Sequence, residues 1–193
     1  MHDMQQTAAP LPKTDVQTPG IWPRGYIQIY TGNGKGKTTA ALGQAIHAAG
    51  YGLHSYIAQF MKGQRYGELI SLRAIPEITI EQFGADTFVH IDYPSADDID
   101  RARRGLTKAH EAMMSGQFQL IILDEILVAI HFKLLPLQQM INFLDEKPPA
   151  VEIILTGRYA PAPLIEKADL VTEMVEIKHY YRQHVAARDG IER

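Results

Sequence analysis

A short apolar run leads directly into a loop of glycines and lysines in the stretch Ile27-Gln28-Ile29-Tyr30-Thr31-Gly32-Asn33-Gly34-Lys35-Gly36-Lys37-Thr38. The run over 27–30 predicts a β-strand, and the alanine-rich sequence after Thr38 predicts a helix. Glycines between a strand and a helix let successive backbone N–H groups converge on phosphate oxygens, and the helix N-terminus adds partial positive charge. The stretch therefore predicts a loop that binds a nucleoside triphosphate.

The loop departs at one position from the general pattern G-x-x-x-x-G-K-[ST], because Thr31 stands where the first glycine belongs. We expect Gly32 and Gly34 to supply the flexibility that the threonine lacks. Lys37 is expected to neutralise phosphate charge, and Thr38 to offer its hydroxyl to Mg²⁺. A tight strand-to-helix turn without a ligand is the alternative, which the register of lysines and glycines disfavours. The candidate nucleotide-binding residues are Gly32, Asn33, Gly34, Lys35, Gly36, Lys37, Thr38 and Thr39.

Apolar segments of strand length alternate with longer helical patterns in the rest of the chain. Several of these segments are nearly continuous in Ile, Leu and Val, which is typical of strands covered on both faces. The pattern predicts an α/β fold, with a mainly parallel sheet of about six strands and helices on both faces. The expected strands are 26–30, 55–60, 78–83, 119–124, 151–156 and 170–175.

Three helices have clear sequence signals. The helix expected at 96–114 begins with the S-x-x-D signal of Ser95 and Asp98 and has apolar residues at spacings of three and four. The helix at 37–49 stops at a glycine, and the helix at 136–144 has a proline in its first turn.

A second acidic element supports the nucleotide site. Leu120-Ile121-Ile122-Leu123 is an apolar run that ends in Asp124 and Glu125, where phosphate-loop proteins place a ligand of the metal ion. Because ligands bind at the carboxyl ends of parallel strands, we expect Thr38, Asp124 and Glu125 to hold Mg²⁺ or Mn²⁺. Arg158 follows another strand and is expected to reach the phosphates, or else to be solvated.

Composition excludes several classes of function. The 193 residues carry a net charge of −3 with both signs interspersed, which predicts neither a nucleic-acid nor a membrane partner. The absence of cysteine excludes disulfides, thiolate metal sites and cysteine nucleophiles. The polar N-terminus is unlike a signal peptide, so we expect a cytoplasmic protein.

The chain is expected to contain one domain at 25–193, preceded by a flexible, proline-rich arm at 1–24. The domain includes a basic and aromatic C-terminal segment, 178–193, which is either a solvated tail or a flap over a large ligand. No serine or cysteine nucleophile with a base and an orienting acid is evident. The reaction therefore uses a nucleophile that is not a protein group, or it is a transfer or hydrolysis from the nucleotide.

Several motifs together resemble the phosphate-loop ATP:corrinoid adenosyltransferases, which adenosylate cob(I)alamin and cob(I)yrinic acid a,c-diamide. The resemblance runs in order over residues 26–192, and the T-G-N-G-K-G-K-T-T-A-A form makes Thr31 a family feature. The matching segments are Tyr30-Thr31-Gly32-Asn33-Gly34-Lys35-Gly36-Lys37-Thr38-Thr39-Ala40-Ala41, Gln59-Phe60-Met61-Lys62-Gly63, Ile122-Leu123-Asp124-Glu125, Leu155-Thr156-Gly157-Arg158, Glu176-Ile177-Lys178-His179 and Gly190-Ile191-Glu192.

The resemblance implies a RecA-like fold and a reaction in which reduced cobalt attacks the 5′-carbon of ATP and triphosphate leaves. It further implies that Lys35 and Lys37 stabilise the leaving group, while a divalent ion bridges Thr38, Glu125 and phosphate oxygens. A homodimer and a flavoprotein reductant are also implied.

Two positions depart from the family pattern. His47 aligns where an arginine is common on the helix after the loop, and we expect it to contact the nucleotide. Phe88 is the candidate for packing against the corrinoid, where an aromatic pair with tryptophan is usual. Two other functions stay open, a RecA-like ATPase or small-molecule kinase and a non-catalytic module that binds ATP or a corrinoid.

Overall fold

The computed structural model describes residues 22–64, 66–85 and 94–192. In these residues six strands form one sheet in the order β3-β2-β4-β5-β1-β6, and every pairing is parallel. This confirms the predicted α/β fold. The strands are β1 (Ile27–Thr31), β2 (Ser55–Phe60), β3 (Ile78–Phe83), β4 (Leu120–Asp124), β5 (Glu152–Thr156) and β6 (Leu170–Glu173).

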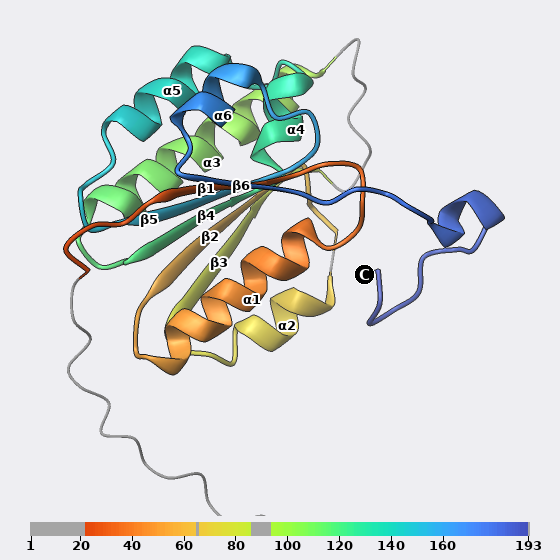
Figure 1. Ribbon diagram of the computed structural model, residues 1–193, viewed down its shortest axis with the longest axis horizontal. Helices are drawn as coiled ribbons and strands as arrows, with labels where there is room; N and C mark the ends of the chain where they lie inside the picture. Colours follow the sequence, from red (N-terminus) through yellow and green to blue (C-terminus); the bar gives the residue numbers. More distant parts are fainter. Residues whose placement is uncertain (1–21, 65, 86–93, 193) are drawn as a thin grey trace, which may run out of the picture.

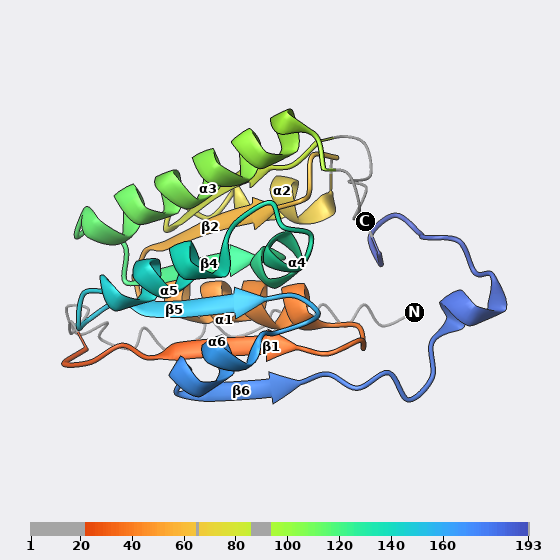
Figure 2. The same cartoon turned by 90° about the horizontal axis from the view of Figure 1, so that it is seen from above.

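Helices cover both faces of the sheet (Figures 1 and 2). On one face lie α1 (Lys37–Gly50) and α2 (Gly67–Leu72). The other face carries α3 (Ala96–Met114), α4 (Ile126–His131), α5 (Leu137–Asp145) and α6 (Ala162–Lys167). After β6 the last element is a short 3₁₀ helix, η1 (Tyr180–Gln183). The three predicted helices agree with the structure to within one residue at each end, whereas the three six-residue helices are too short for periodicity to reveal.

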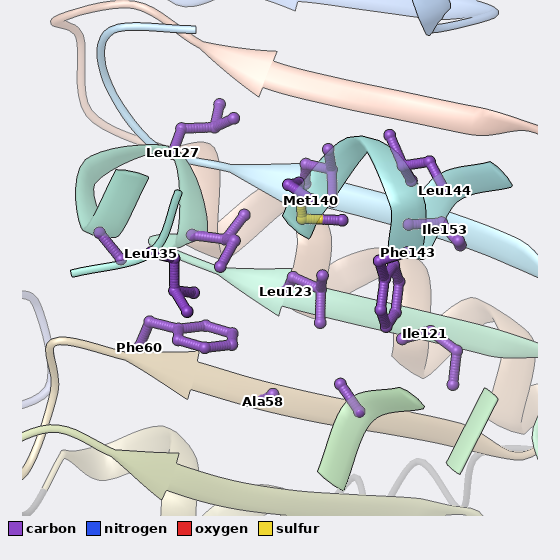
Figure 3. Packing of buried hydrophobic residues seen from close by; sticks show 14 of the residues in the cluster. Ala58, Phe60, Ile121, Leu123, Leu127, Leu135, Met140, Phe143, Leu144 and Ile153 are labelled. Carbon is purple, nitrogen blue, oxygen red and sulfur yellow. The ribbon is translucent and has the colours of Figure 1, made fainter. Parts of the chain in front are cut away.

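The core consists of two apolar layers, one on each face of the sheet. Side chains of β4 alternate between the layers, so that Ile121 and Leu123 face α3 and α5 while Leu120 and Ile122 face α1. Figure 3 shows Phe143 of α5 reaching toward Ile121 of β4, with Met140 of the same helix in the same cluster. All residues of β4 and β5 are buried, so helices cover both faces of these strands, as their nearly continuous apolar sequences predicted.

Strand β6 differs from the others because all four of its residues are exposed. It lies at the edge of the sheet and pairs only with β1 among the described strands. It is also two residues shorter than predicted, because it ends at Glu173 and the carbonyl of the next residue, Met174, accepts from the backbone N–H of Gly34 in the loop. Of the predicted arm at 1–24, residues 1–21 lie outside the described residues, and Trp22 packs partly buried against the α1 layer.

Helix α3 shows how local signals and packing combine. Its predicted start is present as a capping box, in which the Ser95 hydroxyl accepts from the Asp98 backbone and the Asp98 carboxylate accepts from the Ser95 backbone. At Gly105 the helix approaches the sheet closely. An added Cβ there would lie 2.8 Å from Cγ of Phe83 and 2.9 Å from the ring of Phe60.

Two glycine substitutions in helix interiors should therefore have opposite effects on stability. Gly105→Ala should lower the free energy of unfolding by about 1–3 kcal/mol, because overpacking exceeds the gain in helix propensity. The matched control is Gly43→Ala in α1, where nothing lies within 4 Å of the added Cβ. This variant should be stabilised by up to about 1 kcal/mol. Urea unfolding at equilibrium measures both, and equal stability of the two variants would refute the close approach at Gly105.

Candidate nucleotide and metal site

The candidate site lies where the carboxyl ends of four neighbouring strands meet. The strands β2, β4, β5 and β1 are adjacent in the sheet and parallel, so the segments that follow them reach the same edge. These segments carry Lys62 after β2, Asp124 at the end of β4, Thr156 at the end of β5, and the loop 32–36 after β1. Ligands bind at this edge in open α/β sheets.

The glycines of the loop are required by backbone geometry. Gly32 and Gly36 have φ angles of 95° and 117°, in the region that favours glycine. The backbone N–H of Gly34 donates to the carbonyl of Met174 at 2.6 Å. An added Cβ at Gly32 would lie 2.4 Å from the same carbonyl oxygen, so the chain after β6 passes directly against the loop.

Lys37 lies inside the curve of the loop. Its ammonium donates to the carbonyl of Gly34 at 2.7 Å, and the residue is buried. Burial lowers the pKa of Lys37, and the nearby charge of Arg158 lowers it further, while Glu125 and Asp124 act in the opposite direction. The loop thus holds its principal cation in place before any anion binds.

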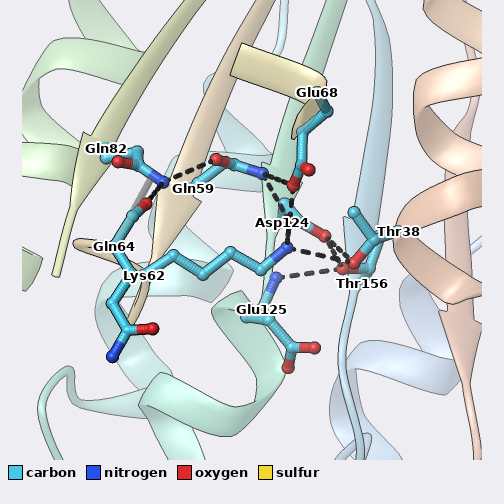
Figure 4. Close-up of polar contacts among 9 residues, drawn as sticks. All are labelled: Thr38, Gln59, Lys62, Gln64, Glu68, Gln82, Asp124, Glu125 and Thr156. Carbon is cyan, nitrogen blue, oxygen red and sulfur yellow. Dashed lines mark hydrogen bonds and ion pairs between the residues drawn. The ribbon is translucent and has the colours of Figure 1, made fainter. Parts of the chain in front are cut away.

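A fully buried carboxylate, that of Asp124, is the centre of the polar network in Figure 4. Its Oδ1 accepts hydrogen bonds from the hydroxyls of Thr38 at 2.8 Å and Thr156 at 2.7 Å. Its Oδ2 accepts from the Lys62 ammonium at 2.7 Å and from the Gln59 amide at 3.2 Å. The network ties the first turn of α1 to the ends of β4 and β5 and to the segment after β2.

Glu125 has a different environment from its neighbour. Its φ of 60° turns the chain into α4, and its backbone N–H donates to the Thr156 hydroxyl at 2.9 Å. In Figure 4 its carboxylate points away from the pair of Asp124 and Lys62. Burial raises the pKa of Glu125, and the charge of Asp124 raises it further, against the lowering effect of Lys62, Lys37 and Arg158.

Lys62 is the main cation of the network. Its side chain is 15% exposed, and its ammonium lies 3.7 Å from the Glu68 carboxylate as well as 2.7 Å from that of Asp124. Burial lowers the pKa of Lys62, but its carboxylate partners, Asp124 first, outweigh that effect and raise the pKa overall. Sequence reasoning assigned no role to Lys62, although its position after a strand that ends at the site edge was a usable signal.

The network and the loop border one cleft of about 850 Å³, a size suited to a ligand as large as a nucleotide. Of the predicted nucleotide-site residues, all but Gly32 and His47 are among the described residues that line it. Near the end of α1 the lining residue is Ile46, while the neighbouring His47 is exposed. Phe88 lies outside the described residues. The lining includes Asn33, Gly34, Lys35, Gly36, Lys37, Thr38, Thr39, Leu42, Gly43, Ile46, Lys62, Tyr66, Glu68, Glu125, Arg158, His179, Ile191 and Glu192.

The C-terminal segment closes part of the cleft. In Figure 1 the chain leaves β6, loops outward through η1 and returns toward the body of the protein. Lys35 of the loop donates to the carbonyl of Ile191 at 2.9 Å and lies 3.4 Å from the Glu192 carboxylate. Glu192 is also bonded to Tyr180 and Arg188. The segment therefore contacts the nucleotide loop directly, in the manner of a flap.

The residues that could hold a metal ion are few. No group of three or more His, Cys, Asp or Glu side chains suited to a metal occurs in the parts of the chain that the structure describes. The Thr38 hydroxyl and the Asp124 carboxylate nevertheless place two hard oxygen donors 2.8 Å apart at the head of α1. Ions such as Mg²⁺ use few protein ligands and complete their shell with water and substrate phosphates. The donor set fits such an ion.

The strand order and the loop define a phosphate-loop protein with a RecA-like fold. One solved structure with this fold is similar, the KaiC-like protein PH0186 of Pyrococcus horikoshii OT3. Its TM-score is 0.50 at 20% identity, and the match covers 78% of this chain and 73% of that one. No helix among the described residues is long and apolar enough to cross a membrane.

Residues 23–193 match the family model described as ATP:corrinoid adenosyltransferase BtuR/CobO/CobP. A corrinoid adenosyltransferase of Sinorhizobium sp is 34% identical over 179 residues, covering 88% of this chain and 80% of the relative. That of Escherichia coli (strain K12) is 34% identical over 170 residues, covering 88% and 86%. The chain belongs to the ATP:corrinoid adenosyltransferase family, which confirms the resemblance, and it is a transferase that uses ATP.

The Thr156 hydroxyl supplies a clear test of the network. Thr156→Val keeps the shape of the side chain but removes a donor to buried Asp124 and an acceptor for the Glu125 backbone. We expect a loss of about 1–3 kcal/mol in the free energy of unfolding, measured with urea. The control Thr172→Val on exposed β6 should change stability by less than about 0.5 kcal/mol. Equal effects at the two positions would contradict the central place of Asp124.

Proposed function

We propose that this protein transfers the 5′-deoxyadenosyl group of ATP to the reduced cobalt of a corrinoid and releases triphosphate. The observation that carries the proposal is the set of cationic side chains on one cleft, Lys35, Lys37, Lys62 and Arg158. They line the same cleft as the glycine-rich loop, which is proposed to hold the triphosphate of ATP. Such a site is suited to a leaving group whose negative charge grows during the reaction.

The reaction needs no protein nucleophile. The cobalt contributes an electron pair to a new bond with the 5′-carbon, and the bond from that carbon to the triphosphate oxygen breaks with its electrons on the triphosphate. The work of the protein is to hold both reactants in line and to stabilise the departing charge. Lys37 would exchange its bond with the Gly34 carbonyl for phosphate oxygens, and Lys35 would exchange its contacts with Ile191 and Glu192 in the same way.

Thr38, Asp124 and Glu125 are the residues that would hold Mg²⁺, or Mn²⁺ in its place. Two of them offer adjacent oxygens, and Glu125 lines the same cleft. The ion would supply further positive charge beside the phosphate oxygens of the leaving group. Asp124 owes its usefulness here to its burial, because a carboxylate without competing water attracts a cation strongly.

The remaining parts of the proposal rest on the family resemblance. They are a contact of His47 with the nucleotide, Phe88 against the corrinoid, a flavoprotein as electron donor, a homodimer and a cytoplasmic location. The corrinoid substrate is cobalamin or cob(I)yrinic acid a,c-diamide.

Product analysis tests the reaction itself. The protein should be incubated with ATP, Mg²⁺ and chemically reduced cobalamin, and the products separated by chromatography. We expect an adenosylated corrinoid and triphosphate in equal amounts, because each transfer breaks one bond to the 5′-carbon and releases the three phosphates as one intact group. ADP and phosphate would instead identify an ATPase or kinase, and bound ATP without turnover would identify a binding module. A reaction without cobalamin is the control.

Phe88→Ala separates the two substrate sites. We expect it to abolish most adenosylation while the affinity for ATP, measured by calorimetry, stays within about twofold, because Phe88 is proposed to meet the corrinoid alone. Lys37→Ala is the comparison, since it should weaken ATP binding itself. An unchanged rate for Phe88→Ala would remove this residue from the corrinoid site.

A further inference from the structure

The ammonium of Lys62 lies beside the two side chains that are proposed to hold the divalent ion. It is 2.7 Å from Oδ2 of Asp124 and 3.4 Å from the hydroxyl oxygen of Thr38. The Asp124 side chain is fully buried and that of Lys62 is 15% exposed, so water screens this pair only weakly. Figure 4 shows the long side chain of Lys62 extended toward these oxygens.

An ion and this ammonium would compete for the same oxygens. A Mg²⁺ ion bound to the Thr38 oxygen at about 2.1 Å would lie within about 5.5 Å of Nζ, which is 3.4 Å from the same oxygen. Both cations would compete for the carboxylate of Asp124, and their like charges repel strongly where water is scarce. The ammonium in this position therefore weakens binding of the ion.

The ammonium of Lys62 neutralises Asp124 in the nucleotide-free protein and can move to phosphate oxygens in the cleft. A buried carboxylate without a cation is costly, and Lys62 satisfies Asp124 when no ion is bound. The ammonium of Lys62 is carried on a flexible stem of four carbons, and the residue lines the same cleft as Lys37 and Arg158. Phosphate oxygens that enter this cleft would give the ammonium new anionic partners.

We propose that Lys62 is the resident cation of this site, which keeps divalent ions out of the nucleotide-free protein. The ammonium leaves Asp124 only when a triphosphate arrives to receive it, so the ion and the triphosphate bind as a unit. Lys62 is thus a positioning residue that couples the two binding events. The inference rests on the proposed ion at Thr38 and Asp124.

Binding of Mn²⁺ to the nucleotide-free protein tests this coupling without any need for activity. The loss of the free Mn²⁺ signal in electron paramagnetic resonance measures the bound ion. Wild-type protein should bind Mn²⁺ weakly. Lys62→Met should bind it about tenfold more tightly or better, because the carboxylate of Asp124 is then without a cation. Adding Asp124→Asn to Lys62→Met should return the affinity to that of the wild type.

Three further measurements make the result decisive. Lys62→Gln, which still donates a hydrogen bond to Asp124, should also gain affinity for Mn²⁺, and thermal unfolding shows which variants are folded. Lys167→Met is the matched control, because Lys167 pairs with Asp145 on the surface and is not among the described residues that line the cleft. Its affinity for Mn²⁺ should equal that of the wild type.

Two results would overturn the inference. One is tight binding of Mn²⁺ by the nucleotide-free wild type, and the other is a folded Lys62→Met or Lys62→Gln variant that gains no affinity. Titration of the wild type with Mn²⁺ and ATP together separates this failure from that of the proposed function. If a protein-bound Mn²⁺ complex forms there and Asp124→Asn weakens it, the ion site stands and only the role of Lys62 is lost. If no protein-bound Mn²⁺ forms even with ATP, the ion itself is refuted.

Discussion

The burial of the Asp124 carboxylate is the constraint on which the arrangement of this site depends. A charge that water does not reach must be met by donors from the protein, and here the donors come from three other parts of the chain. Thr38 lies at the start of α1, Lys62 follows β2, and Thr156 ends β5. One side chain therefore fixes the loop, the helix that follows it and two neighbouring strand ends relative to one another.

The strands and the long helices could be predicted because their causes are local. Strands β4 and β5 read as apolar runs, and the start of α3 is set by Ser95 and Asp98, three positions apart. The exposure of β6 could not be predicted in this way, because it follows from the edge position of that strand in the sheet order. The approach of Met174 to Gly34 is likewise a tertiary contact with no local signal.

The site residues also divide into those with a local sequence signal and those that only the fold reveals. Lys37, Thr38, Glu125 and Arg158 were predicted from motifs and all line the cleft, because a phosphate loop and strand ends carry their own geometry. Which residue near the end of α1 lines the cleft could not be predicted from residue type. Neighbouring residues point about 100° apart on a helix, so Ile46 faces the cleft and His47 does not. Lys62 and Thr156 stood in motifs that matched the family, but only the fold reveals that both serve Asp124.

The contact between the loop and the chain after β6 has a consequence for how the protein is made. The loop is synthesised well before Met174, whose carbonyl accepts from Gly34. Strand β1 also lies between β5 and β6, two strands that leave the ribosome long after it. A growing chain thus carries its triphosphate loop without the partners that shape it, and the loop can take its final shape only after β5, β6 and Met174 have been synthesised.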